Sequence, residues 1–221
     1  GRASSASTSF NNGDRLTVIV LTDSNPPTEV SWDSVPLAQI GSTVDQGGVS
    51  ISIYSDTVKT GNYQVGVTFS ATARYIVWTI SHTGTYGIRA YDTGYGSGTS
   101  SLVTVATGDG KDDDVILDAA VWAQRAGTIS QGSPSRTLEE TAASGGAIPD
   151  IEGILNSYLL TADLSFNLLV RNSYTNSDDW VAMSIVLAGS AMEYEAESER
   201  LGRTHGSTDA NDTRLGRTHG S

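Results

Sequence analysis

The sequence contains no cysteine and only two lysines, Lys59 and Lys111. Without cysteine, the chain can form neither a disulfide framework nor a thiolate metal site. Acidic residues outnumber basic ones by 25 to 13, so the net charge is −12. Negative charge opposes docking on nucleic acid, where lysine and arginine must replace condensed counterions, and on anionic membranes. We therefore expect no nucleic-acid partner and no membrane partner.

Long apolar runs and strong helix formers are also scarce. No apolar run approaches the roughly 18 residues of a membrane-spanning helix, and the chain does not open on the basic and apolar regions of a signal peptide. Leucine, lysine and glutamate, which favour helices, are few. Serine and threonine make up about a quarter of the 221 residues, and glycine contributes 24. This composition favours short β-strands joined by glycine turns.

Hydrophobic patterning predicts where the strands lie. The segment 15–22 (RLTVIVLT) is a continuous β-branched run, typical of a strand covered on both faces. The segment 29–40 predicts two short strands around a tight turn at Asp33-Ser34, and Pro36 places the second strand at a sheet edge. Three further segments alternate between apolar and polar residues, as strands with one dry and one wet face do. They are 47–56, 61–71 and 73–84.

Two further segments have an irregular hydrophobic pattern, and two more are predicted to pair with each other. The glycine- and tyrosine-rich segment 84–100 predicts a loop, and 137–143 (TLEETAA) predicts either one helical turn or a loop. The segments 162–173 and 179–190 predict a closing hairpin. The last of these strands is apolar at nearly every position, which indicates a central place in its sheet.

These segments amount to about ten strands, with no long helix and no β-α alternation. The pattern predicts an all-β fold, a single antiparallel β-sandwich that is Ig-like or jelly-roll-like. We expect an extended N-terminal arm over residues 1–12, the sandwich domain over 13–190, and an extended C-terminal tail over 191–221.

The order of the predicted strands resembles that of a known module. The stretches NNGDRLTVIVLT, EVSWDSVPLAQI and SISIYSDTVKTGNYQVGVTFSATARYIVWTISHTG are followed by LVTVAT, DDDVILDAAVWA and DWVAMSIVLAG. This order resembles a β-sandwich module that recurs in phage structural proteins and in environmental secreted proteins, over about residues 10–190. Ser34 stands where that module often has glycine, which predicts a different turn type. The resemblance implies a surface-displayed building block of a capsid, tail, fibre or extracellular filament, and it carries no catalytic signature.

An acidic turn, 108–114 (GDGKDDD), joins two predicted strands and raises the question of calcium. Its oxygen ligands would be Asp109, Asp112, Asp113 and Asp114. A calcium loop of the EF-hand type places acidic groups at alternate positions and glycine at the sixth. Here Lys111 occupies the third position and Asp114 the sixth. A solvated hairpin turn is therefore favoured over a calcium site, and we expect no cofactor.

Three tyrosines, Tyr86, Tyr91 and Tyr95, fall in the segment predicted to be a loop. Tyrosine offers a large contact area at a low entropy cost, as it does in antibody paratopes and on sugar-binding faces. Two interpretations are open. The tyrosines pack against a neighbouring subunit, which is the favoured interpretation, or they bind glycans.

Catalytic motifs are sparse. His82 is the only histidine before the tail, and the sequence contains no G-x-S-x-G, H-E-x-x-H or G-x-x-x-x-G-K-[ST]. The paired carboxylates of a glycosidase meet in space rather than in sequence, so the sequence leaves that arrangement open. We expect the protein not to be an enzyme.

The C-terminal tail is distinguished by a repeat and by its charge pattern. The octapeptide RLGRTHGS occupies 200–207 and again 214–221. Its two histidines, 14 residues apart and without cysteine, are a weak metal signal. Its arginines can make bidentate contacts with carboxylates on a neighbour's acidic surface, so we treat them as candidates for a subunit interface. They are Arg200, Arg203, Arg214 and Arg217. A stretch of alternating glutamates precedes them: Glu193, Glu195, Glu197 and Glu199.

The leading hypothesis is a non-enzymatic structural protein that assembles in many copies. We expect a virion surface, as a capsid decoration or a tail or fibre component, with sheet edges and terminal arms making the contacts. The alternatives are an extracellular filament or surface-layer subunit and a carbohydrate-binding adhesin. The expected partners are copies of the same chain, other subunits of the particle or filament, and, for the adhesin, glycans.

Overall fold

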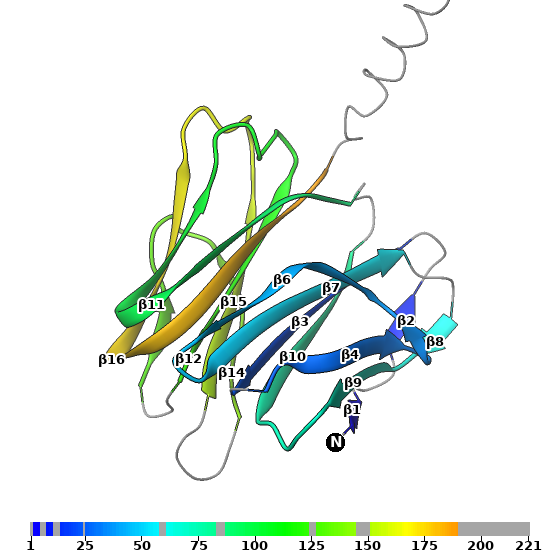
Figure 1. Cartoon of the computed structure of the whole chain (residues 1–221). Coiled ribbons are helices and arrows are strands. Elements are labelled where there is room, and N and C mark those ends of the chain that lie inside the picture. The colour runs from blue at the N-terminus through cyan, green and yellow to red at the C-terminus, as the bar shows by residue number, and fades with distance from the viewer. Residues whose placement is uncertain are drawn as a thin grey trace, which may run out of the picture. The chain divides into compact units, whose positions relative to one another are not determined.

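The computed structural model describes residues 2–4, 8–10, 14–23, 25–57, 61–82, 87–123, 127–144 and 151–189. These residues form sixteen strands and no helix, and every strand pairing is antiparallel (Figure 1). The all-β prediction is confirmed. The expectation of about ten strands was too low, because several segments that were predicted to be loops are strands.

Two sheets of four strands come mainly from the N-terminal half of the chain. The middle sheet has the order β10-β3-β7-β6, and the small sheet has the order β1-β9-β4-β5. The strands of the middle sheet are β3 (Arg15–Asp23), β6 (Ala38–Gln46), β7 (Val49–Thr57) and β10 (Tyr75–His82). Those of the small sheet are β1 (Arg2–Ser4), β4 (Pro27–Trp32), β5 (Val35–Pro36) and β9 (Val65–Phe69).

The segment predicted to be an N-terminal arm contributes two short strands. β1 pairs with β9 of the small sheet. β2 (Thr8–Phe10) pairs with β8 (Gly61–Tyr63) in a separate two-stranded sheet. These pairings attach part of the predicted arm to strands of the same chain.

The large sheet comes from the C-terminal half of the described chain and has the order β11-β16-β12-β15-β14, with β13 paired to β16. The prediction that the last strand is central is confirmed, since β16 lies between β11 and β12. The strands are β11 (Ile88–Val105), β12 (Val115–Trp122), β13 (Ile129–Gln131), β14 (Thr137–Ser144), β15 (Ile151–Leu159) and β16 (Leu168–Leu187).

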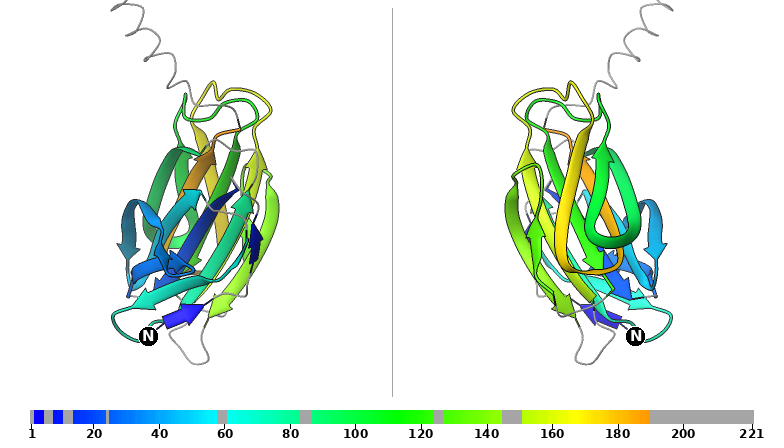
Figure 2. Two further views of the ribbon diagram at one scale, coloured as in Figure 1. Left: turned by 90° about the vertical axis from the view of Figure 1, so that its right-hand side faces the viewer. Right: turned by 90° about the vertical axis from the view of Figure 1, so that its left-hand side faces the viewer.

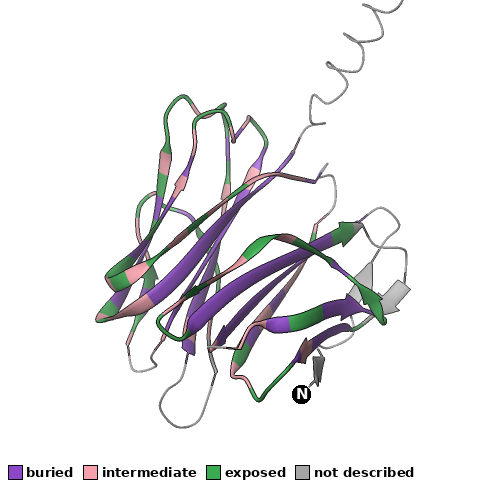
Figure 3. Ribbon diagram, in the orientation of Figure 1, coloured by how far each residue is buried: buried purple, intermediate pink, exposed green. Residues whose placement is uncertain are grey.

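The middle sheet is covered on both faces, as the buried ribbons in Figure 3 show. On one face Ile51 and its neighbours pack against Leu117 and Met183 of the large sheet. On the other face Val18 packs with Val67 of the small sheet. The sheets are therefore stacked face to face in a sandwich-like arrangement (Figure 2).

Because both faces of the middle sheet are covered, the prediction that one face of β7 is exposed to water is wrong. Its alternation is as predicted, but Ser50 and Ser52 are fully buried together with Ile51. Their hydroxyls find partners instead of water: Thr22 and Ser50 lie 2.6 Å apart through their hydroxyl oxygens. Small polar residues at these positions are tolerated because a neighbouring hydroxyl replaces the hydrogen bond to water.

The predicted tyrosine loop and closing hairpin both prove to be strands. Residues 88–105 form β11, and residues 168–187 form the single strand β16, which pairs with β11 along its length. The pair has a register shift between Gly98 and Ser100. At this bend the two strands fold back over the large sheet, so that Val103 packs on Trp122.

Glycine makes that fold-back possible. A Cβ at Gly94 would lie 2.1 Å from the backbone oxygen of Leu102, and one at Gly96 would lie 3.0 Å from the ring of Trp180. β11 thus touches itself across the bend. Gly94 leaves room for the close approach of two backbone segments, and Gly96 leaves room for the Trp180 ring.

Two smaller predictions have opposite outcomes. The tight turn between β4 and β5 is confirmed, and Asp33 and Ser34 have φ values of 43° and 65°. Positive φ at both central residues is what a type I′ hairpin turn requires. The segment 137–143, predicted to be a helical turn or a loop, belongs to β14, because its pairing with β15 overrides the helix propensity of Leu138, Glu139 and Glu140.

Candidate functional site

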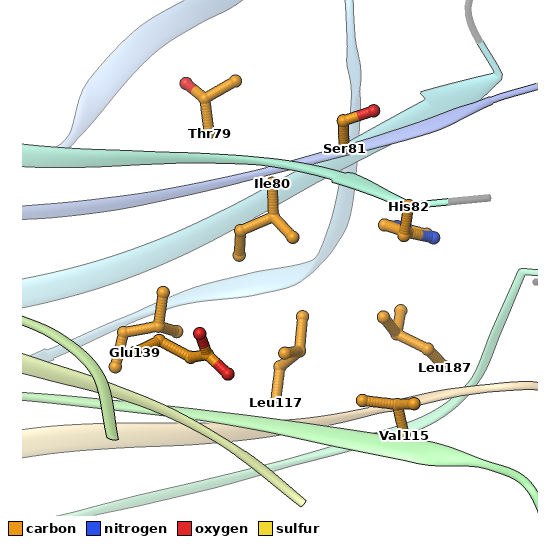
Figure 4. Close-up of a pocket in the computed structure, with 9 residues that line it drawn as sticks. Thr79, Ile80, Ser81, His82, Val115, Leu117, Glu139 and Leu187 are labelled. Atoms are coloured by element: carbon orange, nitrogen blue, oxygen red, sulfur yellow. The ribbon is translucent and has the colours of Figure 1, made fainter. Parts of the chain in front are cut away.

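A cleft with a volume of about 470 Å³ opens between the middle and large sheets, beneath β10 (Figure 4). Ile80 of β10 points down into it, and Leu117 and Leu187 of the large sheet form part of its floor. The side chains of Thr79 and Ser81 point the opposite way. The residues that line the cleft are Thr79, Ile80, Ser81, His82, Val115, Leu117, Glu139, Leu155 and Leu187.

The cleft lies where β10, the last strand of the middle sheet, faces the large sheet. Within the described residues β10 pairs only with β3, so its other edge carries no strand. On the large sheet Val115 is the cross-strand partner of both Leu187 and Leu159, which places the three side chains on one face. Leu159 is 56% exposed, whereas Leu155 on the same face of the same strand is 5% exposed. The apolar floor therefore continues from the core to the surface.

His82 is one of the two ionisable groups that line the cleft. The imidazole Nε2 lies 3.0 Å from the Thr17 hydroxyl. The pKa of His82 is lowered to about 4, chiefly by burial and also by the positive charge of Arg15, while the negative charge of Asp14 opposes the shift. His82 is therefore neutral at pH 7 and contributes a hydrogen-bonding group without charge.

Glu139, on β14, is the other ionisable group, and its carboxylate accepts a hydrogen bond from the Ser157 hydroxyl. The cleft is thus apolar along its floor and polar at His82 and Glu139. Such a combination suits the binding of an extended apolar group with a few polar atoms, because the apolar floor supplies affinity and the polar groups supply orientation.

The hydroxyl nearest to His82 is poorly placed for nucleophilic catalysis. Thr17 lies on the same face of the middle sheet as its cross-strand partner Ile80, but it is fully buried and lies 3.4 Å from the Ser55 hydroxyl, so its own hydroxyl is closed to solvent. Ser81 points away from the cleft. A nucleophile must reach both its base and the substrate, and neither hydroxyl does so here.

The acidic turn holds its strands in place through Asp114. This fully buried carboxylate pairs with Arg89, with Nε and Oδ2 2.7 Å apart, and accepts hydrogen bonds from the backbone N–H groups of Lys111 and Gly189. Two other residues of the turn contact Asp163. The backbone N–H of Asp112 donates to the Asp163 carboxylate, and the Lys111 ammonium pairs with it at 3.2 Å. These contacts lower the pKa of Asp163. Of the four carboxylates that the calcium alternative required, that of Asp114 is occupied by protein donors, and that of Asp112 accepts from the backbone N–H of Asp113.

Of the three candidate tyrosines, the structure describes Tyr91 and Tyr95, and both lie on the edge strand β11 rather than in a loop. Tyr91 is 42% exposed, and its ring covers Gly41, where an added Cβ would lie 2.4 Å from the ring. Tyr95 is 64% exposed. The remaining candidates for a subunit interface lie outside the described residues: Tyr86, Arg200, Arg203, Arg214 and Arg217.

A buried polar network lies on the opposite face of the large sheet, under the folded-back strands. Asp118 and Arg136 form an ion pair with Oδ1 and Nε 2.9 Å apart, and both side chains are almost fully buried. The Asp118 carboxylate also accepts from the amides of Asn156 and Asn172, at 3.1 and 2.8 Å. Burial raises the pKa of Asp118, and the Arg136 charge with the two amide donors opposes that shift.

This network is structural, because it joins β12, β15 and the folded-back part of β16 in a region closed to solvent. The Arg136 guanidinium donates to the backbone oxygen of Arg171 and to the Asn172 side chain, both at 2.7 Å. The sequence analysis missed these residues. The signal was Asp118 itself, a charged residue within the apolar strand Val115–Trp122.

No three His, Asp or Glu side chains within the described ranges come together as metal ligands would. In the same part of the chain, no helix has the length and apolar character needed to cross a membrane. Comparison with protein-family models, with curated proteins and with solved structures finds no significant match to this chain.

Proposed function

We propose that the protein is a non-enzymatic structural subunit that assembles in many copies, on a virion surface as a capsid decoration or a tail or fibre component. The observation that carries this proposal is the edge of β10 that pairs with no other described strand, together with the apolar cleft between β10 and the large sheet. An uncapped edge is a template for pairing with another chain. The resemblance to the phage and secreted module agrees with this role, and on that basis we infer that the stacked sheets belong to the Ig-like or jelly-roll-like sandwiches.

The other supporting feature is exposed apolar surface spread over several elements. Leu159 and Phe166 are 56% and 65% exposed, respectively. Further exposed apolar side chains lie on the outer surface of the folded-back strands, at Leu102 and Leu169. Assembly would remove such surface from water, with a gain of roughly 25 cal/mol for each Å² buried.

The test is deletion of residues 191–221. If the tail and the sheet edges mediate assembly, the shortened chain remains folded by circular dichroism but no longer forms particles or filaments in electron micrographs. Normal assembly of the shortened chain contradicts this mechanism. Micrographs of the full chain also separate the virion proposal from the alternative of an extracellular filament or surface-layer subunit.

A second candidate function, a carbohydrate-binding adhesin, rests on the exposure of Tyr95 on an uncharged stretch of β11. Solvent-facing tyrosines can stack on sugar rings. A glycan array probed with the full chain and with Tyr95→Ala and Tyr91→Ala variants tests this candidate. Binding that both variants reduce supports it, and absence of binding to every glycan removes it.

A further inference from the structure

The edge of β11 lacks the features that discourage pairing at most other sheet edges of the described chain. Edge strands are protected by charges, proline, bulges or short length. β14 carries two glutamates and a register shift, β6 has a register shift between Ile40 and Val44, and β1 and β5 have only three and two residues. Among the described strands β11 pairs only with β16, and its register is unbroken from Ala90 to Gly98.

One face of this regular segment carries a row of exposed, uncharged side chains. Because alternate residues of a strand share a face, the row consists of Tyr91, Thr93, Tyr95 and Ser97. The only charged residue between Ala90 and Gly98 is Asp92, and it lies on the opposite face. A chain with a net charge of −12 repels its own copies. The uncharged row lets two copies approach without placing like charges opposite each other.

β10 is the other long edge strand with an unbroken register, but its surroundings differ. It packs against β14, the edge strand of the large sheet, where Glu139 and Glu140 are exposed. Two copies that met at this edge would bring four glutamates together, so an unlike partner is favoured there. The β11 edge instead favours an identical partner.

We propose that β11 of a second copy pairs antiparallel with β11, centred on Gly94, so that two large sheets join into one across a two-fold axis. This inference rests on the proposed function and names one of the contacts that assembly would use. Main-chain hydrogen bonds between the two edges supply affinity. The contact is isologous, because both copies use the same surface.

The exposed tyrosines fit this pairing. Centred on Gly94, it pairs the whole segment from Ala90 to Gly98 of one copy with that of the other. Tyr95 then lies opposite the partner's Thr93 and diagonal to the partner's Tyr95, a separation that aromatic side chains can bridge. Pairing would thus cover a side chain that is 64% exposed in the single chain.

A lysine placed in the row tests the contact, since lysine on an edge strand opposes pairing. The two-fold axis would bring the two new ammonium groups of Thr93→Lys close together. We expect this variant to weaken association about ten-fold, measured by sedimentation of the full chain over a range of concentrations. Thr141→Lys makes the same charge change at an exposed threonine of β14 and should leave association unchanged. Circular dichroism checks that both variants are folded.

Cysteine cross-linking tests the register, because the chain has no cysteine of its own. A Thr93→Cys chain is mixed with a Tyr95→Cys chain of different mass. We expect several-fold more mixed disulfide than from a mixture of Thr141→Cys with Tyr95→Cys. Without this excess the pairing centred on Gly94 is wrong.

The possible outcomes separate this inference from the function on which it rests. Weaker association of Thr93→Lys, with Thr141→Lys unaffected, supports the two-fold contact. Equal association of the two variants overturns it. If Thr93→Lys assembles normally although deletion of residues 191–221 abolishes assembly, the inference fails and the proposed function stands. A full chain that stays monomeric and forms no particles or filaments contradicts both.

Discussion

The two faces of the large sheet are covered in different ways. The outer face is covered by β11 and β16, strands of the same sheet that fold back over it, and the contact contains the network of Asp118, Arg136, Asn156 and Asn172. The inner face is covered by the middle sheet through apolar contacts, and this cover ends at the cleft. A buried polar network demands one exact arrangement, because every donor needs its acceptor. Apolar packing makes no such demand, so one end of the inner face is left open.

The largest expected effect comes from breaking the outer network. Replacing Arg136 by methionine leaves the Asp118 charge buried without its partner, which costs about 3–5 kcal/mol of stability. Urea unfolding of Arg136→Met measures this loss. Arg171→Met, at an exposed side chain on the folded-back part of β16, is the control and should change stability by less than about 0.5 kcal/mol.

A further replacement distinguishes the buried charge from the loss of arginine packing. In the Arg136→Met background, Asp118→Leu removes the orphaned carboxylate and should restore part of the lost stability. If the double variant is as unstable as the sum of the two single variants, the ion pair is not the source of the effect.

The next effect comes from preventing the fold-back. In Gly94→Ala the new Cβ would lie 2.1 Å from the backbone oxygen of Leu102, and backbone cannot move aside as a flexible side chain can. We expect a loss of about 1–3 kcal/mol from overpacking, measured by thermal or urea unfolding. Thr93→Ala, at the exposed neighbouring position, should unfold nearly as the unchanged protein does. Equal stability of the two variants would show that the two parts of β11 do not approach closely in solution.

A smaller effect is expected at the cleft and depends on pH. The folded pKa of His82, about 4, lies below the ordinary value of 6.5. The unfolded chain therefore binds a proton at this residue before the folded chain does. Stability is lost as the pH falls from about 6.5 and the loss is complete below about 4. Because His82 is only partly buried, solvent screening limits this loss to about 1–2 kcal/mol.

Carboxylates also titrate in acid, so the stability change due to His82 must be separated from theirs. Replacing His82 by an uncharged residue does this. Between pH 7 and pH 4.5, a His82→Gln variant should lose less stability than the unchanged protein does. Urea unfolding of both proteins at the two pH values measures the difference. Equal losses would mean that His82 is protonated equally in the folded and unfolded chains.

The smallest effect on folding is expected where the inner face is uncovered. Leu159→Ser should change stability by no more than about 0.5 kcal/mol, because the side chain is already 56% exposed. Leu155→Ala, on the covered part of the same face, should cost about 2–5 kcal/mol. If the two variants are equally destabilised, the cleft is closed in solution. Reduced assembly of Leu159→Ser without loss of fold would agree with the proposed role of the floor.

Much of the strand pattern could be predicted from the sequence. The alternation around Ile51, the turn at Asp33-Ser34 and the central place of β16 are all found in the structure. Local periodicity and turn chemistry carry these features. The cleft could not be predicted in this way, because its lining comes from five strands that are distant in sequence. His82 stood out only as a single histidine, and nothing in its neighbourhood indicated Glu139 as a second ionisable group in the same cleft.

The sequence by itself determined that the chain is all-β, where several strands such as β3, β7, β10 and β12 lie, and which of their residues share a face. These properties follow from the period-two geometry of a strand, which is local. Only the tertiary structure decided that Ser50 and Ser52 are buried, that residues 168–187 form one strand, and that an apolar cleft lies between β10 and the large sheet. Such features depend on which sheet faces which, and burial on a given face is set by distant segments of the chain.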